Sequence, residues 1–176
     1  MSRSPYFFVE RYNEITKRYE LQHPIIWNSN HTAQEQADLF PYNGCHDLFS
    51  IVTNSEMNNL PEMYGVHHGL PNGACEEINK AYKNCTFTEE DRAFTPTAYW
   101  FTYADMYIYY LEHPKVVDYE AMDEAYLSTE DEKTINIMTD NPIKTLKDRV
   151  DSFLEVCDYW SWRNDYSQIR IVYWIM

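Results

Sequence analysis

The sequence predicts a single α+β domain, in which a small antiparallel sheet with an N-terminal hairpin and a C-terminal strand packs with several helices. Three observations support this fold class. The chain has 176 residues, which suits one domain and is short for two. Aromatic and β-branched residues form strand-like segments at both ends, whereas the apolar residues between the ends recur with helical spacing. Since no repeat or linker interrupts the chain, we expect residues 1–176 to form one acidic domain.

The two ends of the chain are predicted to be strands. Residues 6–12 and 17–22 interleave aromatic and β-branched residues with charges around a short polar segment, which is typical of a β-hairpin. Residues 168–175 alternate isoleucine and tyrosine with other large side chains, which indicates a strand inside a sheet. We expect the first and last strands to belong to one sheet.

Helices are predicted between these strands from the spacing of the apolar residues. They cover residues 46–53, 74–83, 103–112 and 143–160. Segments 24–44 and 54–73 contain Pro, Asn and Gly without a clear period, which indicates loops.

The predicted helix at residues 103–112 has the clearest boundaries. Thr102 and Asp105 fit a capping box at its start, and Pro114 ends it. Because this helix is apolar on nearly every side, we expect it at the centre of the domain. The residues that we expect on buried helical faces are Trp100, Tyr107, Leu111 and Phe153.

The charge of the chain restricts its partners. The sequence has 14 Lys and Arg against 28 Asp and Glu, a formal net charge of −14. Nucleic-acid phosphates repel such a surface, so we expect no direct binding to DNA or RNA. A basic protein surface is the complementary partner, although an acidic balance also serves solubility alone.

The expected location is the cytoplasm of a bacterial host cell. No leader-like apolar segment follows the first residues, and no apolar run approaches the roughly 20 residues of a membrane helix. We therefore expect no membrane contact. The irregular spacing of the cysteines predicts free thiols in a reducing compartment. They are Cys45, Cys75, Cys85 and Cys157.

An acidic stretch between Lys115 and Lys133 is the strongest candidate for a binding surface. It contains seven carboxylates and no basic residue, and aromatic and aliphatic residues are interleaved with them. Carboxylates attract Arg and Lys, and aromatic side chains anchor interfaces. Runs of charged residues also occur in helices that are simply exposed to solvent. The predicted partner-binding residues are Asp118, Tyr119, Glu120, Asp123, Glu124, Tyr126, Glu130, Asp131 and Glu132.

The sequence predicts no catalytic residue, metal site or cofactor. The metal-ligating candidates are scattered without the paired spacing of structural zinc sites. Cys45, His46 and Asp47 include the residue types of a nucleophile triad, but adjacent side chains point in different directions and do not converge. No glycine-rich phosphate loop is present, and the chain has four glycines in total. We therefore expect a protein that acts by binding.

Several segments resemble a family of small phage proteins that begin Met-Gly-Cys-Asp-Ile-His and continue into a hairpin. Residues 1–10 of this chain stand at the positions of the family's opening motif. Residues 45–49 are similar to the family's Tyr-Asp-Leu-Phe segment, and residues 68–71 to its Arg-Gly-Leu-Pro turn. Residues 99–106 resemble its Ser-Trp-Leu-Thr-Leu-Ala-Glu-Leu segment, and residues 169–175 its closing Val-Arg-Ile-Val-Phe-Trp-Phe strand.

The family's titratable positions are not kept in this chain. Its opening Cys, Asp and His fall on Arg3, Ser4 and Tyr6, and the histidines before its central helix fall on Pro96 and Ala98. Metal binding or acid–base chemistry at those positions would therefore be lost here.

The sequence as a whole also resembles the type II-A anti-CRISPR proteins of gut Firmicutes and their phages, which inhibit Cas9. This resemblance implies an inhibitor that binds Cas9, with or without guide RNA, and blocks recognition or cleavage of target DNA. DNA mimicry by the acidic surface and locking of a Cas9 domain are both open. The alternatives are a metal-dependent phage accessory enzyme, such as a nuclease or nucleotide hydrolase, and an accessory protein with no defence target.

Overall fold

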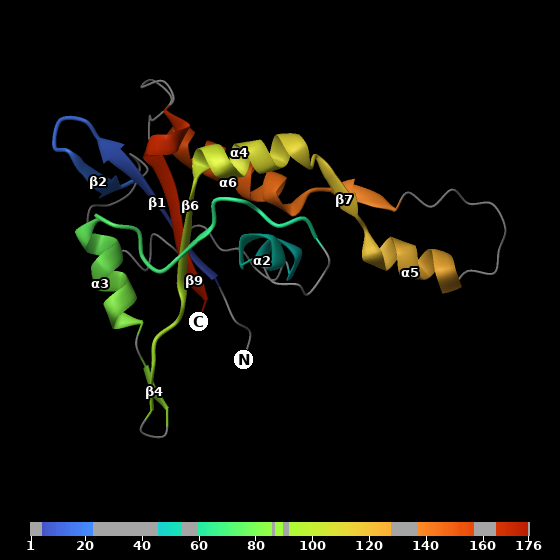
Figure 1. Cartoon of the computed structure of the whole chain (residues 1–176), viewed down its shortest axis with the longest axis horizontal. Coiled ribbons are helices and arrows are strands. Elements are labelled where there is room, and N and C mark those ends of the chain that lie inside the picture. The colour runs from blue at the N-terminus through green and yellow to red at the C-terminus, as the bar shows by residue number, and fades with distance from the viewer. Residues whose placement is uncertain are drawn as a thin grey trace.

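A five-stranded antiparallel sheet forms the centre of the protein in this computed structural model (Figure 1). The structure describes residues 5–22, 46–53, 60–85, 87–89, 92–127, 137–156 and 165–175. The strands lie in the order β2-β1-β9-β6-β3. Their bounds are β1 Pro5–Asn13, β2 Arg18–Leu21, β3 His67–His68, β6 Ala98–Thr102 and β9 Ile169–Ile175.

The last strand is the most central one, as the sequence predicts. β9 pairs with β1 on one side and β6 on the other, with Val9 opposite Ile171 and Trp100 opposite Val172. Both of its faces are buried, which explains why nearly every position of this strand is large and apolar. The predicted hairpin is therefore confirmed, and so is the expectation that the first and last strands belong to one sheet.

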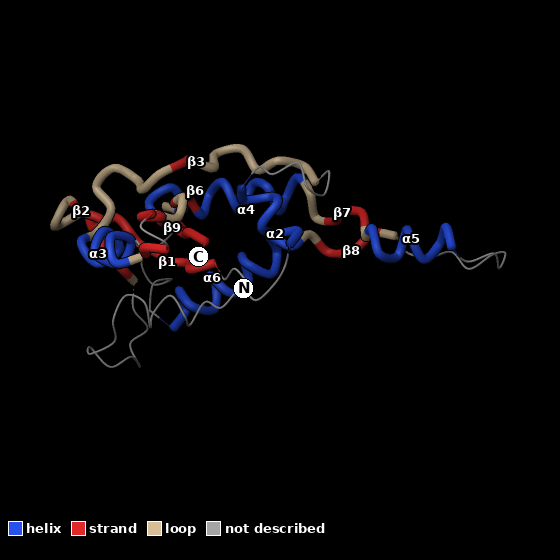
Figure 2. The backbone as a smooth tube through the Cα atoms, turned by 90° about the horizontal axis from the view of Figure 1, so that it is seen from below, coloured by secondary structure: helices blue, strands red, loops and turns tan. Residues whose placement is uncertain are grey.

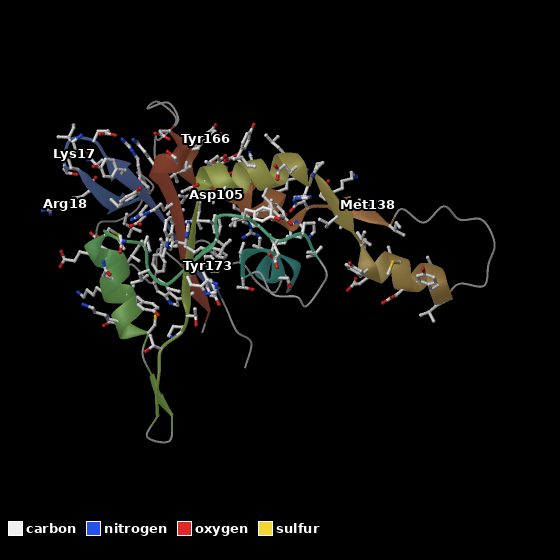
Figure 3. All side chains as sticks on the ribbon, in the orientation of Figure 1. Lys17, Arg18, Asp105, Met138, Tyr166 and Tyr173 are labelled. Carbon is white, nitrogen blue, oxygen red and sulfur yellow. The ribbon has the colours of Figure 1, made fainter. Side chains whose placement is uncertain are left out.

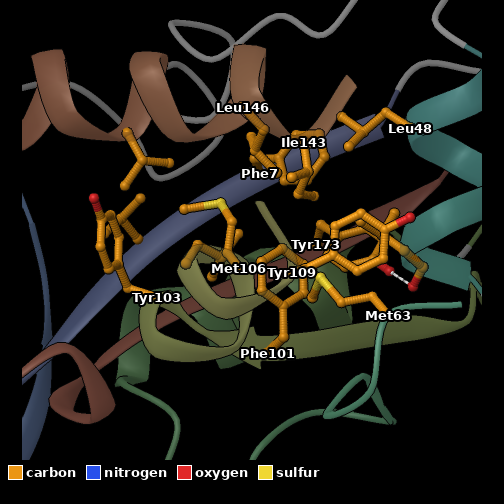
Figure 4. Close-up of a cluster of buried hydrophobic side chains, with 14 of the residues drawn as sticks. Phe7, Leu48, Met63, Phe101, Tyr103, Met106, Tyr109, Ile143, Leu146 and Tyr173 are labelled. Atoms are coloured by element: carbon orange, nitrogen blue, oxygen red, sulfur yellow. Dashed lines mark hydrogen bonds between the residues drawn. The ribbon is translucent and has the colours of Figure 1, made fainter. Parts of the chain in front are cut away.

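One face of the sheet holds the larger core. Alternate strand residues such as Phe7, Phe101 and Tyr173 pack there against three helices (Figure 4). These helices are α2 His46–Thr53, α4 Tyr103–Glu112 and α6 Pro142–Val156. In α6 the buried residues Leu146, Val150 and Leu154 follow the helical spacing that predicts this element.

On the opposite face, helix α3 Glu76–Asn84 packs against the sheet (Figure 2). Ile78 and Ala81 of α3 pack with Phe8 and Trp174 of the sheet. Its first turn carries Glu76 and Glu77, where the helix dipole favours negative charge. The fold is thus a small α+β domain with helices on both faces of its sheet.

Helix α4 starts where the sequence predicts, but it is not surrounded by protein. The Thr102–Asp105 capping box is present. Leu111, predicted to be buried, is 59% exposed, and Ile108 is 52% exposed. The expectation of a central helix is therefore wrong, because aromatic and aliphatic residues occupy both the inner and the outer side of α4. Trp100 lies in strand β6 and not on a helix, and it is half-buried.

The remaining elements are short. They are β4 Phe87–Glu89, β5 Arg92–Phe94, β7 Lys115–Val117, α5 Tyr119–Leu127, β8 Met138–Asp140 and the 3-10 helix η3 Tyr166–Gln168. The predicted loops at 24–44 and 54–59 and the predicted helix end at 157–160 lie outside the described residues. In the described ranges, no helix has the length and apolar character needed to cross a bilayer.

Candidate interaction surface

Strand β7, helix α5 and strand β8, which cover residues 115–127 and 138–140, form an arm that projects from the body of the protein (Figures 1 and 2). Strands β7 and β8 pair antiparallel as a two-stranded ribbon, with Lys115 opposite Asp140 and Val117 opposite Met138. Helix α5 follows β7 and lies on the far side of this ribbon from the body (Figure 1). Within the described part of the arm, Val116 alone is buried.

The root of the arm is fixed by Asn141, a fully buried polar residue between β8 and α6. Its side-chain amide donates to the carbonyl oxygen of His113, and its Oδ1 accepts a 2.7 Å bond from the backbone N–H of Ile143. Its backbone N–H donates to the carbonyl oxygen of Pro114 at 3.3 Å. Asn141 therefore ties the two ends of the arm to each other and to the start of α6, which constrains the direction of the arm.

Asp118 has a structural role at the start of α5. Its Oδ1 accepts a 3.1 Å bond from the backbone N–H of Ala121, as an N-cap residue does. Its own backbone N–H donates to the carbonyl oxygen of Ile137 at 2.6 Å. Asp118 thus joins the helix to the second half of the arm, and part of its hydrogen-bonding capacity serves the fold.

Helix α5 carries its carboxylates and its aromatic side chains on adjoining sides. Successive residues turn by about 100° around a helix axis. Glu120, Asp123 and Glu124 consequently lie on one side of α5, and all three are exposed. The adjoining side carries an aromatic and methionine row, which consists of Tyr119, Met122 and Tyr126. Leu127 lies among the carboxylates. No residue of α5 is buried, and Tyr126 is 81% exposed.

The structure therefore places most of the predicted partner-binding residues together on one short helix. They are Asp118, Tyr119, Glu120, Asp123, Glu124 and Tyr126. The predicted residues Glu130, Asp131 and Glu132 lie outside the described ones. A helix of this length is marginal alone, so the cap and the ribbon are needed to hold it.

The negative charge of α5 is not neutralised within the described part of the chain. None of its carboxylates forms an ion pair with a described Lys or Arg. At the root, by contrast, Asp140 pairs with Lys144 at 2.8 Å. This hydrogen bond lowers the pKa of Asp140 and raises that of Lys144. Because α5 lacks such a pair, its carboxylates are available to a cationic partner.

The histidines and cysteines do not assemble a site in the described structure. His67 and His68 are exposed on β3, where their rings lie against Trp100 and Tyr99. Burial raises the pKa of the Cys75 thiol and also that of Cys85. The described residues contain no group of three or more His, Cys, Asp or Glu that could hold a metal ion. Cys45 and the side chain of His46 lie outside the described part.

Sequence reasoning missed two features of this region. The outer side of α4 was expected to be core, yet it exposes Ile108 and Leu111 beside the root of the arm. The role of Asn141 was also missed, although Pro114 and the Asn141–Pro142 pair mark the two ends of the arm.

No protein-family model matches the chain, and no curated protein or solved structure matches it.

Proposed function

We propose that this protein is a binding inhibitor of a nucleic-acid-handling defence protein, and that it binds through the arm. The sequence resemblance selects Cas9, with or without guide RNA, as the candidate partner in the cytoplasm of a bacterial host. Cas9 reads its short DNA motif with arginines and holds the guide–target duplex in a basic channel. A protein that covers such groups removes the electrostatic attraction on which DNA binding depends. Inhibition of this kind needs no catalytic residue and no cofactor.

The observation that carries the proposal is the position of α5. This helix projects from the body, buries none of its residues and presents Glu120, Asp123 and Glu124 on one side (Figure 1). Helix α5 therefore contributes no buried side chain to the core of the body. A basic protein surface could contact the carboxylates and the aromatic row of α5 together, whereas a nucleic-acid phosphate backbone would be repelled.

The first prediction tests the arm by removing charge and keeping shape. The arm variant is Glu120→Gln, Asp123→Asn and Glu124→Gln. Its affinity for purified Cas9–guide RNA complex should fall at least about tenfold, or about 1.4 kcal/mol, because exposed complementary charges are lost. Binding of wild type should also weaken more than that of the variant between about 50 and 500 mM salt, since salt screens exposed charges. Titration calorimetry at several salt concentrations measures both effects.

A matched control distinguishes the arm from the overall charge. The control variant Glu62→Gln, Asp148→Asn and Glu155→Gln removes the same number of exposed carboxylates from the body. It should bind as wild type does. If the two variants lose affinity equally, the binding depends on net charge and not on the arm. If wild-type protein neither binds nor inhibits the complex, Cas9 is not the partner.

A further inference from the structure

We infer that the docking surface continues from the arm onto the outer side of α4, and that it takes a partner segment whose apolar residues are flanked by Lys or Arg. This inference rests on the proposed function, because it assumes that the arm binds a protein. It adds a second contact region, and it specifies the chemistry of the segment that is bound.

The exposed apolar residues are concentrated in one part of the described chain. Among the described residues, eight large hydrophobic side chains are exposed. Two of them, Ile15 and Tyr64, are isolated in other parts of the chain. The other six fall between α4 and β8. They are Ile108, Leu111, Tyr126, Leu127, Ile137 and Met138. Isolated exposed apolar residues are ordinary, whereas a concentration of them marks an interaction surface.

Helix α4 carries large apolar residues on two sides. Its inner residues Tyr103, Met106 and Tyr109 are buried in the core. On its outer side, Ile108 and Leu111 are more than half exposed. The inner row provides the packing that holds α4 on the body. The outer row adds nothing to that packing, and its exposure to water is unfavourable unless a partner covers it.

Hydrogen bonds at Asn141 hold the arm close to the end of α4. Only His113 and Pro114 separate α4 from β7, and Asn141 bonds to the carbonyl oxygens of both. Figures 1 and 3 show α4, the ribbon and α5 following one another along the longest axis of the molecule. A rigid partner segment can therefore contact both regions at once without reordering the chain.

Charge selects the kind of partner. Exposed carboxylates flank the apolar residues, at Glu112 on α4 and at Glu120, Asp123 and Glu124 on α5. A second copy would bring like charges together, in a chain that already carries −14. An anionic membrane would be repelled for the same reason. A protein segment with an apolar row between Lys or Arg residues satisfies both the exposed apolar side chains and the carboxylates.

The test compares two double alanine variants, each of which removes two exposed apolar side chains. The α4 variant is Ile108→Ala with Leu111→Ala, and the control is Ile15→Ala with Tyr64→Ala. The probe is a synthetic amphipathic helical peptide with leucines on one face and lysines on the other. The α4 variant should bind this peptide at least about fivefold more weakly than wild type, as expected for residues inside an interface. The control should bind within about twofold of wild type. Both variants should keep the wild-type melting temperature.

The other outcomes separate this inference from the proposed function. If the neutralised arm variant binds more weakly but the α4 variant behaves like the control, the arm binds alone and the extension onto α4 is wrong. If neither variant differs from wild type, both proposals are wrong. Equal binding of a peptide with glutamates in place of lysines contradicts the charge assignment. A wild-type dimer in sedimentation that the α4 variant abolishes would identify the partner as a second copy.

Discussion

At the scale of single residues, the least expected feature is a charged pair inside the smaller core. Arg170 on β9 forms an ion pair with the fully buried Glu10 on β1. The guanidinium group lies 3.2 Å from the ring centroid of Tyr19 and donates to the carbonyl oxygen of Asn72 at 3.0 Å. The second carboxylate oxygen of Glu10 accepts from the backbone N–H of Cys75 at 3.0 Å. The pair thus fastens the loop before α3 to the sheet.

This pair predicts a pH-dependent loss of stability when the cation is removed. Burial raises the pKa of Glu10 above its usual value of 4.5, while the charge of Arg170 lowers it. In Arg170→Met the second effect is lost, so the pKa of Glu10 should rise further. A raised folded-state pKa gives stability that is present below the unfolded pKa and lost as pH rises through the folded one. Arg170→Met should therefore cost about 3–5 kcal/mol near pH 8 and clearly less near pH 5.

Urea unfolding of the wild type and the variants at several pH values measures this effect. Adding Glu10→Gln to Arg170→Met should recover part of the lost stability and flatten the pH dependence, because no buried carboxylate remains to ionise. If Arg170→Met alone loses the same free energy of unfolding at every pH, the ionisation of Glu10 is not the cause of the loss.

At the scale of elements, the structure reverses the prediction for the outer side of α4. Met106 is fully buried and Leu111 is exposed on the same helix. Met106→Ala should cost about 2–5 kcal/mol, since it leaves a cavity in the core. Leu111→Ala should change the free energy of unfolding by no more than about 0.5 kcal/mol. Chemical denaturation of both variants compares the two sides directly. Equal losses would place Leu111 in the core, contrary to the structure.

Elements with a strong local signal could be predicted from the sequence. The hairpin, β9, the capped start of α4 and the helical spacing of α6 each have a pattern of residues that only one structure satisfies. Strands β3 and β7 are two and three residues long, too short for alternation to be visible. The exposure of Ile108 was not predictable either, because the apolar character of a helical residue does not determine whether it is buried or exposed to solvent.

The candidate site was predictable in composition but not in arrangement. The predicted acidic stretch from Asp118 to Glu132 includes α5, Tyr119–Leu127, and its last residues lie outside the described ones. The adjoining charged and aromatic sides of α5 depend on where the helix begins, and an acidic run does not determine this position. The capping role of Asp118 and the tie at Asn141 depend on contacts with residues at the other end of the arm. Such contacts are set by the tertiary structure and leave little local trace in the sequence.

At the scale of the whole molecule, the body and the arm have different physical roles. The sheet and its helices bury nearly all of the described core, and the described arm contributes Val116 alone. The two ends of the arm meet at the body, where the backbone N–H of Asn141 donates to Pro114 at 3.3 Å. The body should therefore fold without the arm, while binding should require it.

Replacing residues 115–140 with about three glycines between Pro114 and Asn141 tests this division, because short connections between helices are common. The variant loses the burial of Val116, worth about 1.5 kcal/mol, so its melting temperature should fall by no more than about 5 °C. Its circular dichroism should keep the signal of the sheet and of α4 and α6. Its affinity for the Cas9–guide RNA complex and for the lysine–leucine peptide should be lost. A variant that no longer folds would show that the arm is part of the core. A folded variant that still binds would move the interaction surface to the body.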